Sequence, residues 1–289
     1  MRPSERLTVL FLLALSAASA AFCPAAGRLA LLAGLALATA GLARTGAAAG
    51  PLGLLRDVVV PVVVVVATFS VLDPVITAVN PARHDGALAA FDARWLGGLL
   101  EAWRGALGRP DRFTDLAYVA YASFYLLPLT AFLLARARGE AAMERVAFTV
   151  LLGFYLSYLG YLLWPAAGPR VPEEEEWRLG GGAVAWAVRW FLRTAEATTL
   201  DAFPSGHTAL SLVAAALGTR LAPRVAPLLV GWAAAVVFST VSVHVHYGAD
   251  LLAGAVLALL TLALAPAAAR ALGGRRTGTR PGGAAVLPI

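Results

Sequence analysis

The sequence contains no lysine, a single cysteine and few charged residues of either sign. All 23 basic residues are arginine, and charged residues occupy 14% of the 289 positions. The lone Cys23 excludes an intrachain disulfide and a metal site built from several thiolates. No cluster of carboxylates indicates a magnesium or calcium site, so we expect neither a metal nor another cofactor. The net charge of +6 comes from arginines, which membrane proteins concentrate in cytoplasmic loops, and we expect no nucleic-acid partner.

Hydrophobic residues, by contrast, occupy 60% of the chain and repeatedly form runs of the length that a bilayer-spanning helix requires. This pattern predicts an all-α, polytopic membrane helical bundle. Arg2 and Arg6 precede the first run, which is typical of a signal peptide that is either cleaved or kept. The predicted spans are residues 7–22, 28–43, 58–79, 115–135, 144–164, 205–221, 225–243 and 249–268.

Two further segments have the pattern of amphipathic helices that lie in the membrane interface. Residues 85–107 and 183–195 each combine tryptophans with charged side chains at helical spacing. The acidic run Glu173–Glu176 is most simply a solvated loop. The chain is predicted to divide into two N-terminal spans (1–54), a six-span catalytic domain (55–268) and a disordered cytoplasmic Gly/Arg tail (269–289).

The distribution of arginines predicts the orientation of the spans. With the N-terminus inside, the outer loops are neutral or acidic, and residues 165–204 carry four arginines against six carboxylates. The positive-inside rule therefore favours both termini inside the cell, in a bacterial-type cytoplasmic membrane. The arginines of the inner loops are Arg44, Arg56, Arg136, Arg138, Arg145, Arg220, Arg224 and Arg270.

The stretch FPSGHT, residues 203–208, predicts a helix start suited to binding phosphate. Pro204 fits the first helical position, which would put Ser205 and Gly206 in the first turn. Free backbone N–H groups and the helix dipole favour an anion there, and glycine allows it to approach closely. His207 would lie beside the bound anion. Asp201 is expected to cap the helix or to act on a histidine, and capping is favoured.

A second polar group follows some forty positions later, in the segment HVHYGAD. His246 and Asp250 are four residues apart, so a helix reaching back to His246 would let the carboxylate hold one ring nitrogen and leave the other free. On the predicted topology these residues share the outer face with Arg170, Ser205 and His207. Together they indicate phosphoryl transfer through a phosphohistidine, without a metal.

In this scheme each side chain has a role. Neutral His246 attacks phosphorus, Asp250 fixes its tautomer, and His207 protonates the departing group. The fork of Arg170 binds two phosphate oxygens. The simpler interpretation of each motif taken alone is that FPSGHT is an ordinary helix cap and that Arg170 is an interfacial arginine.

The motifs resemble the type 2 phosphatidic acid phosphatase superfamily. Its second motif, PSGH, is complete at residues 204–207, and its third is present as Ser239, His246 and Asp250. The segments YLLWPAAGPR, FPSGHT and HVHYGAD look most like the inositol phosphorylceramide synthase branch, which transfers phospho-headgroups between lipids. The resemblance covers roughly residues 55–268 and implies a six-helix core. It also implies a nucleophile at His246, a general acid at His207, an orienting group at Asp250 and phosphate binding by Arg170, Ser205 and Gly206.

The chain departs from the family pattern at two charged positions. Leu163 stands where the first motif has lysine, and Thr240 stands where the third has arginine. Arg189, Arg193 and His244 are candidates to supply the missing charge and hydrogen-bond donors. The simpler interpretations are headgroup anchoring for the arginines and a structural or interfacial role for His244.

We therefore expect an integral membrane enzyme that acts on a lipid phosphate at the outer, periplasmic face. Its substrate would be phosphatidic acid, a polyprenyl diphosphate or a lipid whose headgroup is transferred to an acceptor such as inositol. Whether water or an alcohol accepts the phosphoryl group stays open, as does the oligomeric state. The alternative is a non-catalytic lipid-phosphate binder or transporter, which the two missing charges favour.

Overall fold

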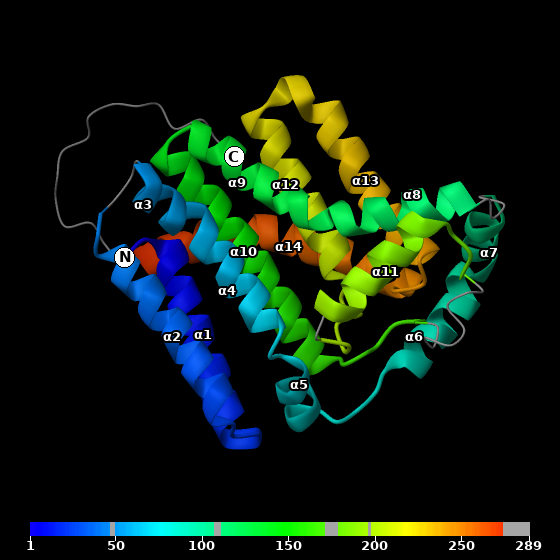
Figure 1. Cartoon of the computed structure of the whole chain (residues 1–289), viewed down its shortest axis with the longest axis horizontal. Coiled ribbons are helices and arrows are strands. Elements are labelled where there is room, and N and C mark those ends of the chain that lie inside the picture. The colour runs from blue at the N-terminus through cyan, green and yellow to red at the C-terminus, as the bar shows by residue number, and fades with distance from the viewer. Residues whose placement is uncertain (47–49, 107–110, 171–178, 196–197, 274–289) are drawn as a thin grey trace.

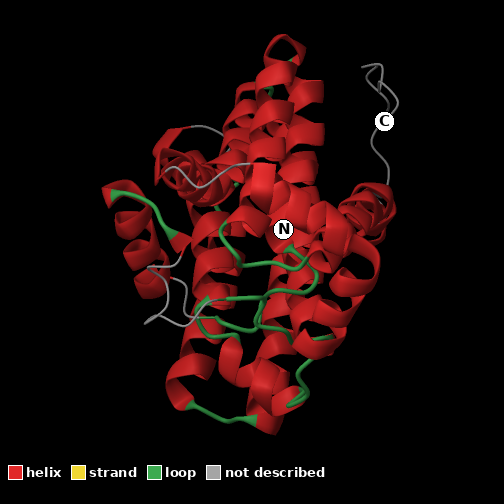
Figure 2. Cartoon of the chain, turned by 90° about the vertical axis from the view of Figure 1, so that its right-hand side faces the viewer, coloured by secondary structure: helices red, strands yellow, loops and turns green. Residues whose placement is uncertain are grey.

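The computed structural model describes residues 1–46, 50–106, 111–170, 179–195 and 198–273, and these ranges contain helices and no strands. Figure 1 shows a bundle with the α1–α2 hairpin on one side and α6 and α7 on the other, and Figure 2 shows the same helices from the side. The α-helices are α1 (Pro3–Phe22), α2 (Ala26–Ala43), α3 (Gly50–Leu54), α4 (Val60–Phe69), α5 (Asp73–Val79), α6 (Asp85–Phe91), α7 (Gly97–Ala106), α8 (Asp111–Ala122), α9 (Leu126–Ala137), α10 (Glu140–Leu163), α11 (Ala183–Ala195), α12 (Gly206–Leu221), α13 (Ala226–Ser242) and α14 (Gly248–Gly273).

Seven helical segments of the described chain are long and apolar enough to cross a membrane, which confirms the predicted polytopic bundle. The remaining predicted span, residues 205–221, is α12, whose 16 residues fall short of the roughly 20 that a bilayer requires. The seven segments are Pro3–Phe22, Ala26–Ala43, Gly50–Phe69, Asp111–Ala137, Glu140–Leu163, Pro223–Ser242 and Gly248–Gly273. The orientation inferred from the arginines stays a prediction, and the acidic run 173–176 lies outside the described residues.

The predicted span at 58–79 is wrong at both ends. Helical structure runs from Gly50 to Phe69, continuous through the π-helical turn Leu55–Val59, and then breaks before α5. Pro74 is the physical reason, because proline fits the first turn of a helix but breaks a helix interior. The carboxylate of Asp73 accepts N–H groups from Thr199 and Leu200 at 3.0 and 3.1 Å, so this break also anchors a distant loop.

Buried charged side chains fix the N-terminal helix to the bundle, at the end opposite the FPSGHT and HVHYGAD segments. Asp57 accepts Arg2 Nη1 at 2.7 Å and Arg136 Nη1 at 2.6 Å, and its side chain is 5% exposed. Glu144 accepts both the backbone N–H and the hydroxyl of Ser4, at 2.8 and 2.6 Å. Because an unpaired buried charge is costly, these contacts fix α1 against α9 and α10.

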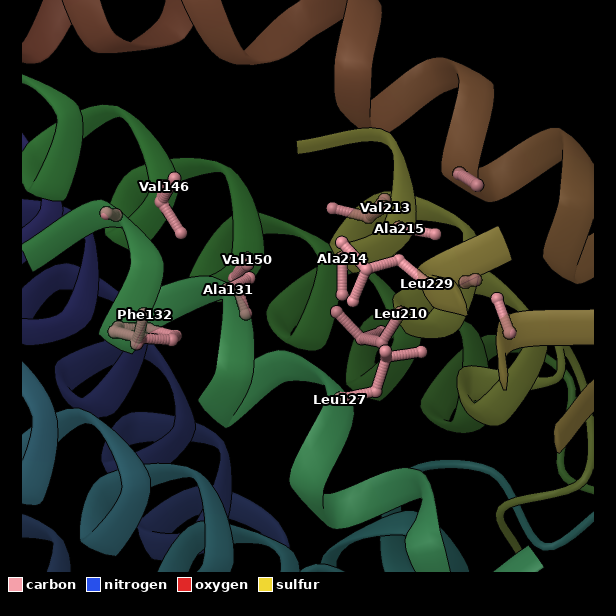
Figure 3. Packing of buried hydrophobic residues seen from close by; sticks show 14 of the residues in the cluster. Leu127, Ala131, Phe132, Val146, Val150, Leu210, Val213, Ala214, Ala215 and Leu229 are labelled. Atoms are coloured by element: carbon pink, nitrogen blue, oxygen red, sulfur yellow. The ribbon is translucent and has the colours of Figure 1, made fainter. Parts of the chain in front are cut away.

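Helix α12 lies in the middle of the bundle and packs against α9, α10, α13 and α14. Its residues Leu210, Val213 and Ala214 join Leu127 of α9 and Val150 of α10 in the main apolar cluster. Figure 3 shows these side chains meeting between the helices. Burial of most of its residues explains why α12 is apolar without a strong polar face. Its N-terminus is thereby fixed at the same end as the last turn of α10 and the first turn of α14.

Both predicted interfacial helices form. Residues 85–106 are helical through α6, the π-helical turn Asp92–Leu96 and α7, while α11 covers 183–195. In α11 the side chains of Trp186 and Trp190 are 62% and 55% exposed, and its buried Ala185 and Leu192 pack on α8. An aromatic face turned away from the bundle is what a helix at the lipid interface requires.

Candidate active site

The helix start in FPSGHT lies two residues later than the sequence predicts. Helix α12 begins at Gly206, and Ser205 is its N-cap, with its hydroxyl accepting the Thr208 N–H at 3.2 Å. Pro204 precedes the helix rather than opening it. Serine is favoured at the N-cap because its hydroxyl accepts an N–H group of the first turn that has no partner within the helix. The N–H groups of Gly206 and His207 are then the first two of the helix, and neither has an i−4 carbonyl partner within it.

His246 and Asp250 meet although His246 is not helical. Helix α14 begins at Gly248, and Asp250 in its first turn reaches back to the preceding loop. Its Oδ2 accepts the Tyr247 N–H at 2.8 Å and lies 3.3 Å from His246 Nδ1. Asp250 is fully buried, and its Oδ1 has no hydrogen-bond partner among the described residues. The carboxylate is therefore positioned to fix the tautomer of His246, with Nδ1 protonated and Nε2 unprotonated.

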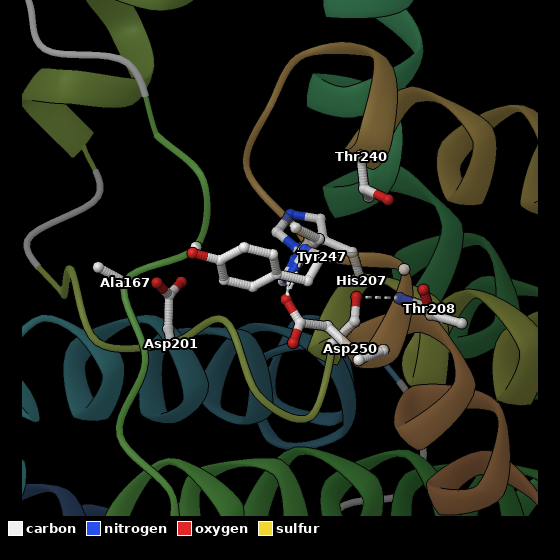
Figure 4. A network of polar contacts seen from close by, with 12 residues as sticks. Ala167, Asp201, His207, Thr208, Thr240, Tyr247 and Asp250 are labelled. Atoms are coloured by element: carbon white, nitrogen blue, oxygen red, sulfur yellow. Dashed lines mark hydrogen bonds and ion pairs between the residues drawn. The ribbon is translucent and has the colours of Figure 1, made fainter. Parts of the chain in front are cut away.

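His207, on α12, and His246, in the loop before α14, come together from separate segments. His246 Nε2 is 3.5 Å from His207 Nδ1, and the ring centroids are 5.6 Å apart. The rings of Tyr121 and Phe124 hold His207, at centroid distances of 4.5 and 4.3 Å. Figure 4 shows His207, Tyr247 and Asp250 in this polar network. The three side chains His207, His246 and Asp250 thus form one buried chain of contacts, which we call the paired-histidine site.

The paired histidines are too close to hold a phosphoryl group between them. Attack requires phosphorus about 3–3.5 Å from the nucleophile, and proton donation requires the leaving oxygen about 2.6–3.2 Å from the acid. Laid end to end, these distances exceed the 3.5 Å that separates the two nitrogens. A phosphate therefore binds beside the pair of rings and not on the line between the two nitrogens.

Close approach of α14 to the start of α12 brings the two halves of the site together. A methyl group on Gly254 would lie 2.6 Å from the Ser205 carbonyl and 2.9 Å from Thr208 Cβ, so only glycine fits. The Ser205 N–H donates to the Asp250 carbonyl at 3.1 Å. That N–H group is therefore satisfied by the protein, and only the Ser205 hydroxyl remains as a donor to a ligand.

Gly206 is required for space as well as for anion approach. A side chain there would overlap the hydroxyl of Tyr161 on α10. We expect Gly206→Ala to lower the stability by about 1–3 kcal/mol, because overpacking must displace the tyrosine. Thermal unfolding in detergent measures this loss. Adding Tyr161→Phe should restore it, and Gly34→Ala, where nothing lies within 4 Å, is the matched control. A double variant as unstable as the single one would contradict this explanation.

Arg170 lies on a loop that carboxylates hold in place. Its Nη2 donates to Asp201 Oδ1 at 2.7 Å, so Asp201 pairs with this arginine and does not cap α12. Asp85 accepts the N–H groups of Ala167 and Gly168 at 3.0 and 2.9 Å. Burial, followed by the nearby charges of His246 and Arg170, lowers the pKa of His207. The structure thus brings Arg170 to the same end of the bundle as the paired-histidine site, with its orientation set by Asp201.

Tyr247 extends the same network to α6. Its hydroxyl lies 3.5 Å from Asp85 Oδ1. Burial, followed by the nearby charges of Asp85 and Asp250, raises the pKa of Tyr247 to about 12. The phenol therefore stays protonated at neutral pH and acts as a hydrogen-bond donor.

The three auxiliary candidates line one cavity. Arg189 and Arg193 of α11, His244 and Arg170 all line a space of about 220 Å³. His244 lies in the turn after α13 with a left-handed φ of 61°, and its Nδ1 is 3.2 Å from the Ser242 carbonyl. None of His207, His246 and Asp250 lines this cavity, so the auxiliary candidates gather beside the paired-histidine site and not within it.

The seven apolar helices make this chain an integral membrane protein. The chain belongs to the PAP2 superfamily, because the model of that family matches residues 86–264, which is more than half of its length. Members of this superfamily are phosphatases, so membership indicates membrane lipid phosphatase or phosphotransferase activity in general. No match to the chain was found among curated proteins or solved structures. The matched segment runs from α6 to α14, and the predicted six-span domain boundary at residue 55 stays a prediction.

The two positions that lack the family's charges have different surroundings. The side chain of Leu163 is 74% exposed at the end of α10, whereas the two histidines are buried. Thr240 is buried in α13, and its hydroxyl donates to the Val237 carbonyl of the same helix at 2.8 Å. The Thr240 carbonyl accepts the His246 N–H at 3.3 Å, so Thr240 supports the loop of the site through its backbone.

Sequence reasoning missed the side chains that support the site. Asp92, in the π-helical turn, accepts the N–H groups of Gly248 and Ala249 at 2.7 and 2.9 Å and so caps α14. A signal for this role was present, because Leu88, Asp92 and Leu96 are four apart and share one helix face. An acidic residue on a face with leucines indicates a buried partner. The contacts of Tyr121 and Phe124 with His207 had no such signal.

Proposed function

We propose that this protein is a membrane lipid-phosphate phosphatase or phosphotransferase that works through a phosphohistidine on His246. The observation that carries the proposal is the buried chain Asp250, His246 and His207, at 3.3 and 3.5 Å, beside the start of α12. One imidazole oriented by a carboxylate, with a second imidazole next to it, supplies a nucleophile and a proton carrier.

The proposed reaction has two steps. The lone pair on His246 Nε2 attacks phosphorus, the bond from phosphorus to the lipid oxygen breaks, and His207 donates a proton to that oxygen. His207 then takes a proton from water or an alcohol, whose oxygen attacks phosphorus and breaks the bond to His246. The N–H groups of Gly206 and His207 and the side chains of Ser205 and Arg170 stabilise the charge on the phosphate oxygens.

The arginine distribution of the loops supports a site on the outer face of a cytoplasmic membrane. The exposed tryptophans of α11 support a position of the site at the lipid headgroups, where a phosphate enters from the bilayer. The likeness of YLLWPAAGPR and HVHYGAD to inositol phosphorylceramide synthases supports transfer to an alcohol acceptor. Hydrolysis, in which water is the acceptor, would require no acceptor pocket.

Product analysis tests this function and separates its two forms. The purified full-length protein is incubated with labelled phosphatidic acid or a polyprenyl diphosphate, with and without inositol. We expect turnover that vanadate inhibits, because vanadate copies five-coordinate phosphorus. Free phosphate alone indicates a hydrolase, and labelled inositol phosphate indicates a transferase. Binding of lipid phosphates without turnover would overturn the proposal in favour of a binder or transporter, which Leu163 and Thr240 support.

A further inference from the structure

We infer that the cavity beside the paired-histidine site binds a second anionic group of the substrate, so that the enzyme prefers a lipid diphosphate to a lipid monophosphate. This inference rests on the proposed phosphoryl transfer at His246. In this inference α11 selects the substrate, although the family motifs do not include this helix.

The lining of the cavity favours an anion. Three guanidinium groups, those of Arg170, Arg189 and Arg193, line about 220 Å³ together with His244, and the described lining contains no carboxylate. Guanidinium groups recognise phosphates through paired N–H donors in a fixed plane.

The arginines are held at the cavity by contacts with the protein. Asp201 holds Arg170 at 2.7 Å. The Gly180 carbonyl accepts Arg189 Nη1 at 3.0 Å, and the Arg189 guanidinium lies over the Tyr118 ring at 5.0 Å from its centroid. Side chains that are oriented before the ligand arrives lose less conformational entropy when it binds.

The position of the cavity identifies which part of the substrate it contacts. Val243, His244 and Val245, which immediately precede His246, form one wall, and Arg170 forms another. The nucleophile and the general acid do not line the cavity. A group bound there is therefore adjacent to the reacting phosphate and is not itself attacked. The second phosphate of a lipid diphosphate has this relation to the terminal phosphate.

Cleavage of a lipid diphosphate at this site requires only water as a further reactant. The His246 Nε2 lone pair forms a bond to the terminal phosphorus, and the bond from that phosphorus to the bridging oxygen breaks. The electron pair stays on the bridging oxygen, which takes the proton of His207, and an anionic lipid monophosphate leaves. The arginines of the cavity stabilise its negative charge. Water then gives a proton to His207 and attacks phosphorus, which releases inorganic phosphate and restores His246.

Binding of a matched pair of non-hydrolysable lipids tests the inference. An alkyl methylenebisphosphonate and an alkyl phosphonate with the same chain are titrated into the purified full-length protein and into its Arg189→Ala and Arg193→Ala variants. We expect each variant to weaken bisphosphonate binding about ten- to hundredfold, the loss typical of a hydrogen bond to a charged group. Phosphonate binding should stay unchanged, which also shows that the variants are folded. Arg94→Ala is the control, because Arg94 is an exposed interfacial arginine over Trp95 and does not line the cavity.

Equal loss for both lipids would overturn the inference, since the arginines would then serve the reacting phosphate or the fold. Unchanged bisphosphonate binding would overturn it as well. Turnover is a separate result. If the wild-type protein hydrolyses neither class of lipid phosphate, the proposed function fails, whereas a bisphosphonate preference that Arg193→Ala abolishes still supports the second anion site.

Discussion

Replacing His246 with alanine is expected to lower kcat for a lipid phosphate by about 10⁴-fold or more, to the level of an enzyme without its nucleophile. His246 is 3% exposed and has one nitrogen facing Asp250 and the other facing His207. Alanine leaves no atom within reach of phosphorus, because His207 is held by Tyr121 and Phe124. Binding of an alkyl phosphonate should be retained, since the proposed phosphate donors are unchanged.

The measurement is release of labelled phosphate by purified protein, with acid-labile labelling of the protein as the second readout. The wild-type enzyme should acquire the label during turnover and the variant should not. His84→Phe is the matched control, because His84 stacks on Trp164 at a centroid distance of 4.0 Å and a phenyl ring keeps that contact. If His246→Ala retained turnover, the phosphohistidine mechanism would be wrong. Loss of turnover in the control would show that the assay reports folding instead.

Much of the bundle was predictable because most spans are single uninterrupted apolar runs. Helices α10, α13 and α14 follow the predicted ranges to within a few residues at most of their ends. The error at 58–79 arose because the apolar run continues across Pro74, where backbone geometry overrides hydropathy. Hydropathy alone also made α12 a full span, although its short apolar run is explained equally well by burial among other helices.

The site was predictable only to the extent that its residues are close in sequence. The spacing of His246 and Asp250 indicated their contact, and the contact forms although the helix begins two residues after His246. The approach of His207 depends on packing, because Gly254 allows α14 to reach Ser205. Periodicity along one segment carries no information on such a contact between two segments. The support from Asp85 was missed for the same reason, since it acts on a loop far along the chain. The leucine face of Asp92 indicated burial but not its partner, the start of α14.

Asp250→Asn is expected to lower kcat by about 10²- to 10³-fold with little change in KM, because it keeps His246 oriented but removes the negative charge that stabilises the cationic phosphohistidine. Asp250 Oδ2 both accepts the Tyr247 N–H and faces His246 Nδ1. In the variant, the amide oxygen replaces Oδ2 and keeps both contacts, while the amide nitrogen replaces Oδ1, which has no hydrogen-bond partner among the described residues. The imidazole proton therefore stays on Nδ1, Nε2 stays free to attack phosphorus, and only the charge is lost.

Comparison with Asp250→Ala separates orientation of His246 from the charge of the carboxylate. Alanine removes the acceptor for His246 Nδ1 as well as the charge, so the imidazole has access to both tautomers, and it leaves a void at a fully buried position. The orientation argument therefore predicts that Asp250→Ala has a lower kcat than Asp250→Asn. Steady-state kinetics of both variants measure the order, and phosphonate binding confirms that each protein is folded. An alanine variant at least as active as the asparagine variant would show that Asp250 does not act by orienting His246. Its contact with the Tyr247 N–H would then make it a structural cap of α14.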